Sequence, residues 1–297
     1  MNFPIIKRTS RLERIFLLAA LVVIGLIVGS VIGLLYAIIS GNDIMSLNSL
    51  RFMQISSQIF TFVLPPILYA MLVKERPFKS LGFSKSTILW LILGVAMMYT
   101  ILPLNSIFTE WNANIKFPES LASFEKLMQD LQERATEVME KFVNVDTIGG
   151  LIINLFMIAG LAALGEELLF RSVIQTSLIK ICKNAHVGIF IASAIFSLFH
   201  MEFYGLLPRL VLGLLMGYMY YYSRSIWIPM AMHFANNGTI VFLYYLNNIG
   251  AINIDVESFG ETNVGILMLS IVAMVALFWF TIKLNKKEGL EIDNQEA

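Results

Sequence analysis

Long apolar runs separated by short polar segments fill most of this chain. Eight of them reach the length of about 17–25 residues that a helix needs to cross a bilayer. They lie at residues 15–40, 52–73, 87–108, 147–164, 186–203, 206–222, 226–246 and 264–283. The fourth run continues through two adjacent glutamates, which predicts one long or broken helix ending near residue 181. The second contains Pro65 and Pro66, which we expect to kink it because each proline removes a backbone donor.

One polar stretch, residues 110–146, has a helical pattern of its own. Apolar positions recur there every three or four residues between charged ones: Phe124, Met128, Leu131, Ala135 and Val138. This spacing predicts an amphipathic helix that lies against the membrane surface or the bundle. We favour a helix that only packs there, and a gate for substrate is the alternative. We divide the chain into three regions: a three-span region (1–146) that contains this outer helix, a core (147–246), and an outer loop, last span and tail (247–297).

Composition agrees with a membrane protein. Of the 297 residues, 57% are hydrophobic and only 14% are charged, and the mean hydropathy is +0.74. Soluble domains are about 25% charged, so the fold class that we predict is all-α, with about eight transmembrane helices. The single cysteine, Cys182, excludes an intramolecular disulfide and a cysteine-based metal site. Nothing in the sequence is typical of nucleic-acid binding, and the expected surroundings are a lipid bilayer.

The positions of Lys and Arg predict how the helices are oriented. Fifteen of the 21 basic residues fall in the N-terminal tail, in every second loop and in the C-terminal tail, and five fall in the remaining loops. Loops rich in Lys and Arg face the cytoplasm. We therefore expect both termini in the cytoplasm and residues 110–146 outside. Arg209 lies within a span, where it either snorkels to the surface or meets an acidic group.

Charged residues interrupt the fourth apolar run at Glu166, Glu167 and Arg171. A charge at the centre of a bilayer costs about 2.5–3.5 kcal/mol on insertion scales, so such residues mark functional sites by default. Glu167 and Arg171 are four apart on a helix and can form an ion pair. Glu166 points about 100° away, since a helix turns by that angle per residue, and is free for acid–base work. The alternative is a buried ion pair that only fixes helix packing.

Two of the three histidines also lie in apolar runs. Phe196 precedes His200 by one turn and shares its face, so its ring can pack beside the imidazole. His233 and Asn237 are likewise four apart and could present two donors to one point, as an oxyanion hole requires. Each element alone has a structural alternative, a packed core histidine or a hydrogen bond between helices. Together they supply a carboxylate base, an imidazole and oxyanion donors, a combination that indicates hydrolysis.

The three motifs also carry a resemblance. Glu-Glu-x3-Arg, Phe-x3-His and His-x3-Asn, in this order on successive spans, resemble the CAAX-protease and bacteriocin-processing (CPBP or Abi) family of intramembrane proteases. Residues 213–237 resemble the usual approach to the third motif, and the likeness covers roughly residues 147–245.

The resemblance implies a role for each matched residue. Glu166 would activate water with help from His200, while His233 and Asn237 would hold the oxyanion. Glu167 and Arg171 would take supporting positions. The family is often called metalloproteases, and Glu166, His200 and His233 could form a zinc site with two histidines and one glutamate. No His-Glu-x-x-His helix is present, so we favour a metal-free water and leave the metal open.

The predicted function is therefore that of a membrane-embedded endopeptidase. Its partner would be a peptide or protein substrate that reaches the membrane from the cytoplasmic side. Within the family, a role in bacteriocin maturation, immunity or anchoring of another protein is the alternative to a prenylated substrate. Outside it, a transporter with a charge relay and a non-catalytic scaffold are the rivals, although the chain lacks the two matching broken segments typical of transporters.

Overall fold

The computed structural model describes residues 10–289, and within them every regular element is a helix. The α-helices and the η segments, which are π-helical (η1, η3, η4) or 3-10 (η2, η5), follow in this order: α1 (Arg11–Ser40), α2 (Leu47–Ser57), η1 (Gln58–Val63), α3 (Leu64–Val73), α4 (Pro77–Ser80), α5 (Ile88–Thr100), α6 (Leu102–Ala113), η2 (Glu119–Leu121), α7 (Ala122–Val143), α8 (Ile148–Asn154), η3 (Leu155–Leu161), α9 (Ala162–Glu167), η4 (Leu168–Gln175), α10 (Thr176–Cys182), α11 (Ala185–Phe199), η5 (Phe203–Gly205), α12 (Leu206–Ser223), α13 (Trp227–Asn248) and α14 (Val264–Lys287). The predicted all-α class is confirmed.

By length and composition, the structure contains five or six candidate membrane spans. Five helices are long and apolar enough to cross a membrane, and a sixth span arises if α5 and α6, bent by 43°, are one broken span. Each of the eight predicted runs contains a helix, but α11 and α13 are not among these candidates. Helix α13 has 22 residues but is not apolar enough. Helix α11 has only 15 residues, or about 22 Å of helix against a hydrocarbon core of about 30 Å. The chain is thus a polytopic membrane protein, and the count of eight is not confirmed.

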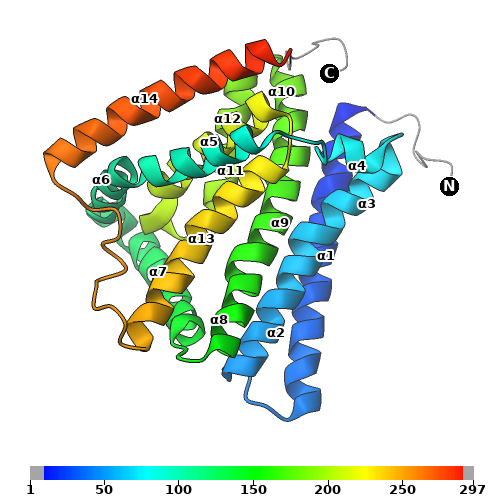
Figure 1. Ribbon diagram of the computed structural model, residues 1–297. Helices are drawn as coiled ribbons and strands as arrows, with labels where there is room; N and C mark the ends of the chain where they lie inside the picture. The colour runs from blue at the N-terminus through cyan, green and yellow to red at the C-terminus, as the bar shows by residue number, and fades with distance from the viewer. Residues whose placement is uncertain (1–9, 290–297) are drawn as a thin grey trace.

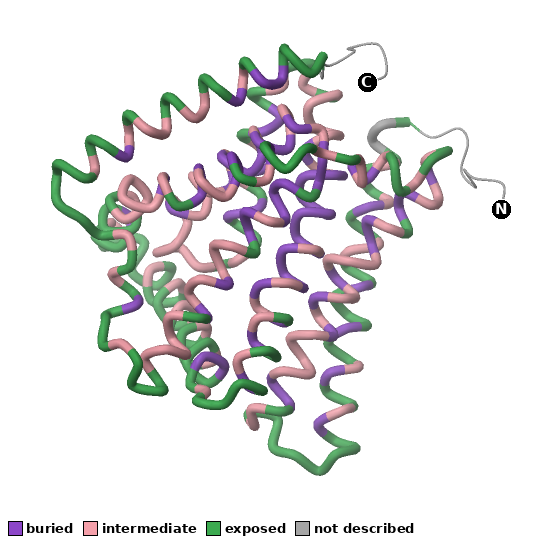
Figure 2. Tube along the Cα trace, in the orientation of Figure 1, coloured by how far each residue is buried: buried purple, intermediate pink, exposed green. Residues whose placement is uncertain are grey.

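The start of α1 and the end of α14 lie toward the same end of the bundle (Figure 1). The turn between α1 and α2 and the start of α8 lie toward the opposite end. Figure 2 shows buried residues concentrated in the centre of the bundle and exposed ones along α1 and α14. Lys7 and Arg8, part of the charge count, lie outside the described residues. Which end faces the cytoplasm stays a prediction.

The expected long fourth helix is confirmed. Residues Ile148–Cys182 form 35 residues of unbroken helix that runs from α8 to α10. The two glutamates end its central segment, α9, and π-helical turns lie on both sides, in η3 and η4. Turns of this kind occur mostly as local bulges and often at functional sites, because the extra residue redirects the side chains that follow.

Close approach of helices places η1 between α1 and α9. Gly25 of α1 lies so near η1 that an added Cβ would sit 1.9 Å from the carbonyl oxygen of Phe60. On the other side, a Cβ on Gly165 would lie 2.8 Å from the Cβ of Phe62. Small residues let helix backbones pack closely in membranes. Pro65 and Pro66 occupy the first turn of α3, and the helix continues through them from Leu47 to Val73.

The predicted amphipathic helix is confirmed as α7. Two of its glutamines reach the segment that follows α11: Gln129 donates to the hydroxyl of Tyr204 at 3.3 Å, and Gln132 to Glu202 at 3.5 Å. An apolar groove of about 180 Å³ lies between this helix and that segment, and Phe124 and Met128 line it. The helix therefore packs beside the residues that follow His200, and its role as a gate stays a prediction.

Candidate active site

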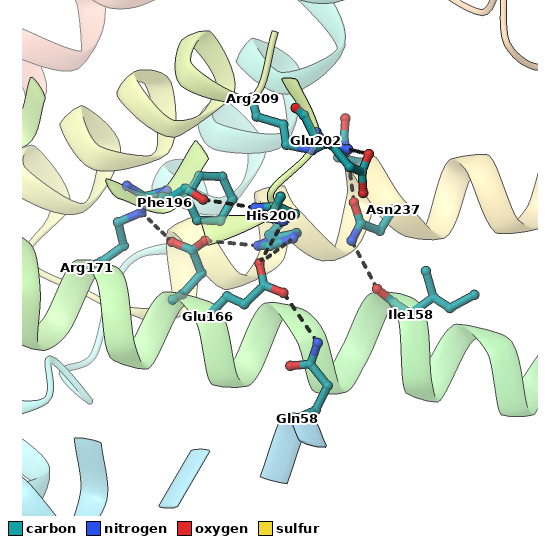
Figure 3. Close-up of polar contacts among 12 residues, drawn as sticks. Gln58, Ile158, Glu166, Arg171, Phe196, His200, Glu202, Arg209 and Asn237 are labelled. Atoms are coloured by element: carbon teal, nitrogen blue, oxygen red, sulfur yellow. Dashed lines mark hydrogen bonds and ion pairs between the residues drawn. The ribbon is translucent and has the colours of Figure 1, made fainter. Parts of the chain in front are cut away.

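Three helices bring one carboxylate and two imidazoles together in the middle of the bundle. Glu166 ends α9 with Glu167, His200 caps α11, and His233 lies in the second turn of α13. The Glu166 Oε2 atom lies 3.8 Å from His200 Nε2 and 3.9 Å from His233 Nε2. Figure 3 shows this cluster with Gln58 on the side of η1. The sequence motifs thus meet at one point.

Glu167 links Arg171 to His233 on the buried side of the cluster. Its Oε2 accepts a hydrogen bond from Arg171 Nε at 2.8 Å, which is the predicted pair four residues apart. Its Oε1 lies 2.9 Å from His233 Nδ1. Glu167 and Arg171 are completely buried. The guanidinium lies over the ring of Phe196, 5.0 Å from its centroid, in the geometry of a cation–π contact.

Hydrogen bonds at Nδ1 determine which nitrogen of each histidine carries its proton. His200 Nδ1 lies 2.9 Å from the carbonyl oxygen of Phe196, and His233 Nδ1 faces a carboxylate. Both partners are acceptors, so each Nδ1 must donate, and in the neutral ring each Nε2 keeps its lone pair. Both lone pairs therefore face Glu166 Oε2. This oxygen is buried and has no hydrogen-bond partner within residues 10–289.

Phe196 supports the two histidines in different ways. Its carbonyl oxygen holds His200 Nδ1, and its ring stands edge-on to the imidazole of His200, with centroids 5.0 Å apart. The same ring stands 6.2 Å from that of His233, again edge-on. The predicted packing of Phe196 beside the imidazole is present, and it extends to the second histidine.

Asn237 lies one turn beyond His233, and other hydrogen bonds already orient its amide. Its Nδ2 donates to the carbonyl oxygen of Ile158 in η3 at 3.0 Å, while its Oδ1 accepts from Asn236 at 3.0 Å. A primary amide has two N–H donors, so one stays available. Two hydrogen bonds hold the amide in place, and neither of them joins it to Glu166.

The site is most open at His200. Its side chain is 28% exposed, against 8% for Glu166 and 7% for His233. Two residues further along, Glu202 pairs with Arg209, so the arginine meets an acidic group, one of the two alternatives left open by the sequence. The cluster is therefore most accessible at the end of α11.

A metal does not fit the site as it is arranged. Among the residues that the structure describes, no three His, Cys, Asp or Glu side chains form a group that could hold an ion. Glu166, His200 and His233 are neighbours, yet the oxygen-to-nitrogen distances of 3.8 and 3.9 Å exceed the roughly 3.3 Å edge of a tetrahedron with zinc bonds of about 2.0 Å.

Sequence reasoning missed one member of the cluster. Gln58, in η1, is 5% exposed and donates from Nε2 to Glu166 Oε1 at 3.4 Å. The available signal was a glutamine within the apolar run 52–73, since polar residues at membrane depth are rare and usually partnered.

Comparison with known proteins supports the resemblance. Residues 148–239 match the family described as Type II CAAX prenyl endopeptidase Rce1-like. The matched segment contains both glutamates, both site histidines and Asn237, and it ends before α14. Comparisons with curated proteins and with solved structures find no match.

Proposed function

From the membership of residues 148–239 in the family of CAAX-type intramembrane proteases, we propose that this chain hydrolyses a peptide bond with a water activated by Glu166. The observation that carries the proposal is the meeting of three acceptors. Glu166 Oε2 and the Nε2 atoms of His200 and His233 face one another with no donor among them. A water molecule can donate one O–H to Glu166 Oε2 and the other to a histidine Nε2, so it fits between these acceptors.

In the proposed reaction, Glu166 takes a proton from this water as the oxygen attacks the substrate carbonyl carbon. A C–O bond forms, the C=O π bond opens, and an oxyanion develops. The free N–H of Asn237 would stabilise it, and Glu167 would hold the neutral His233 in place through its Nδ1–H. When the C–N bond breaks, the proton on Glu166 passes to the leaving nitrogen, so that one water is consumed per bond.

His200 has a different part in this scheme. Its Nδ1 proton is held by the Phe196 carbonyl, so its Nε2 lone pair can accept the second O–H of the water. This bond fixes the direction in which a water lone pair points toward the substrate. Orientation of this kind supplies a large share of the rate in enzymes, because the reacting atoms are held near their geometry for attack.

The family name directs the choice of substrate. A CAAX substrate ends in a cysteine, which carries a prenyl group, and three further residues. A suitable probe is an internally quenched peptide that ends in farnesylated cysteine, two aliphatic residues and methionine, and the same peptide without the lipid serves for comparison. Cleavage of only the lipidated probe would support a prenylated substrate, cleavage of both would support a broader peptidase, and cleavage of neither by the wild-type protein would overturn the proposal.

Glu166→Gln tests the mechanism. The amide has nearly the same shape but cannot take a proton, so the rate should fall by about 10²–10⁴-fold while the protein stays folded. Glu288→Gln is the matched control, because this glutamate also forms a hydrogen bond, to Trp90 Nε1 at 2.8 Å, but lies at the end of α14. A Glu166→Gln enzyme with the full rate would refute the mechanism.

A further inference from the structure

A polar side chain from outside the family-matched segment reaches the proposed base. Gln58 belongs to η1, about 100 residues before α9 in the chain, and its amide nitrogen lies 3.4 Å from Glu166 Oε1. Both residues are buried. In the close-up, Gln58 approaches Glu166 from the side opposite to His200 (Figure 3).

Packing alone gives no reason for a glutamine at this position. Its Oε1 is buried and has no hydrogen-bond partner within the described residues. The one side-chain hydrogen bond that Gln58 makes within residues 10–289 is the bond to Glu166. A buried polar atom without a partner destabilises a protein, and an apolar side chain of the same length would remove that penalty. The amide is therefore explained by the carboxylate that it contacts.

Local structure holds the two groups at this distance. Gly165, next to Glu166, packs against Phe62, which lies one turn beyond Gln58 on the same segment. The absence of a side chain at Gly165 lets α9 approach η1. Of the two Glu166 oxygens, Oε1 then faces the amide and Oε2 faces the histidines. Gln58 thus holds Oε1, while Oε2 faces the position proposed for the water.

We propose that Gln58 is a positioning residue, which donates to Oε1 of Glu166 and so fixes the rotamer that aims Oε2 at the nucleophilic water. The proposal rests on the role of Glu166 proposed above. It extends the site beyond residues 148–239 and gives the second span a part in the reaction. Loss of the amide should leave substrate binding intact and lower the turnover.

The test replaces glutamine by methionine, which has similar length and no polar donor. In Gln58→Met, we expect kcat to fall by about 10- to 100-fold, the scale set by misplacement of a reacting group, with KM within about threefold of wild type. The apparent Tm should change little, because the variant loses a long hydrogen bond of 3.4 Å but also removes a buried oxygen without a partner. The assay uses the lipidated quenched peptide and the full-length protein.

Gln175→Met is the matched control. Gln175 is equally buried, its Oε1 also lacks a partner in the described chain, and its Nε2 donates to the carbonyl oxygen of Gly217 at 2.9 Å. It bonds to a backbone rather than to Glu166. Its replacement loses a shorter hydrogen bond, so the apparent Tm should fall more than in Gln58→Met, while kcat of the folded enzyme stays within about threefold of wild type.

A double mutant separates action through Glu166 from an independent effect. If Gln58 acts only by positioning the carboxylate, adding Gln58→Met to Glu166→Gln should lower the residual rate no further. A full-rate Gln58→Met enzyme beside an inactive Glu166→Gln enzyme overturns the positioning role alone. Equal losses of Tm and activity in both methionine variants would also overturn it. A full-rate Glu166→Gln enzyme would remove the premise of the proposal.

Discussion

Replacing Glu167 by glutamine should change the tautomer of His233, to which Glu167 is hydrogen-bonded. The carboxylate has two acceptor oxygens, one 2.8 Å from Arg171 Nε and the other 2.9 Å from His233 Nδ1. Glutamine offers one acceptor oxygen and one NH2 group. Arg171 is completely buried, and neither Nη atom has a hydrogen-bond partner within residues 10–289. The amide oxygen must therefore stay with Arg171, and the NH2 group then faces His233.

This arrangement forces the histidine into its other tautomer. An amide N–H aimed at Nδ1 requires a lone pair there, so the proton of the neutral ring moves to Nε2. That nitrogen lies 3.9 Å from Glu166 Oε2, and as a donor it would compete with water for the proposed base. The perturbation thus reaches the catalytic carboxylate through the imidazole.

The expected magnitudes differ for rate and stability. The wrong histidine tautomer lowers kcat by about 10⁴-fold in a Ser-His-Asp hydrolase, and we expect a loss of at least about 10²-fold here. Removing one partner of a buried ion pair destabilises by about 3–5 kcal/mol. The amide retains a hydrogen bond to Arg171, which favours the lower end of that range. Expression of the variant should fall as well.

Arg171→Met is the informative comparison. It also breaks the buried pair, but it leaves the carboxylate of Glu167 on His233 Nδ1 and therefore the original tautomer. Both variants should show a lower apparent Tm in detergent. Measured per folded enzyme with the quenched peptide, Arg171→Met should keep much more of kcat than Glu167→Gln. Full kcat in Glu167→Gln, or equal losses of kcat in the two variants, would refute the tautomer argument.

Three further predictions concern metal, packing and orientation. Incubation with EDTA or 1,10-phenanthroline should leave the rate unchanged, and a loss reversed by zinc would contradict the metal-free reaction. Gly165→Ala places a Cβ about 2.8 Å from that of Phe62, so overpacking should lower stability by about 1–3 kcal/mol and activity with it; an unchanged apparent Tm would argue against the close approach of α9 and η1. A cysteine at position 133, with Cys182 replaced by alanine, should react with an impermeant maleimide in intact cells, and labelling only after membrane disruption would reverse the predicted topology.

Local periodicity determined what could be predicted from the sequence. Apolar runs and low charge identify an all-α membrane protein, because backbone hydrogen bonds in lipid must be satisfied within the helix. The spacing of four residues predicted the pair of Glu167 and Arg171, since positions i and i+4 share a face of any regular helix. The same rule placed Phe196 beside His200 and predicted α7. These inferences depend on neighbours in the chain and not on how the helices pack.

Tertiary structure alone decided the contacts between helices. Periodicity cannot tell that His233 bonds Glu167, that Asn237 donates to Ile158, or that Gln58 reaches Glu166 from a distant segment. These distances depend on which helices become neighbours and how closely small residues let them approach. The π-helical segments η3 and η4 add a second reason. Each wide turn shifts the register of the residues beyond it, so a face extrapolated along Ile148–Cys182 at 3.6 residues per turn no longer points the same way.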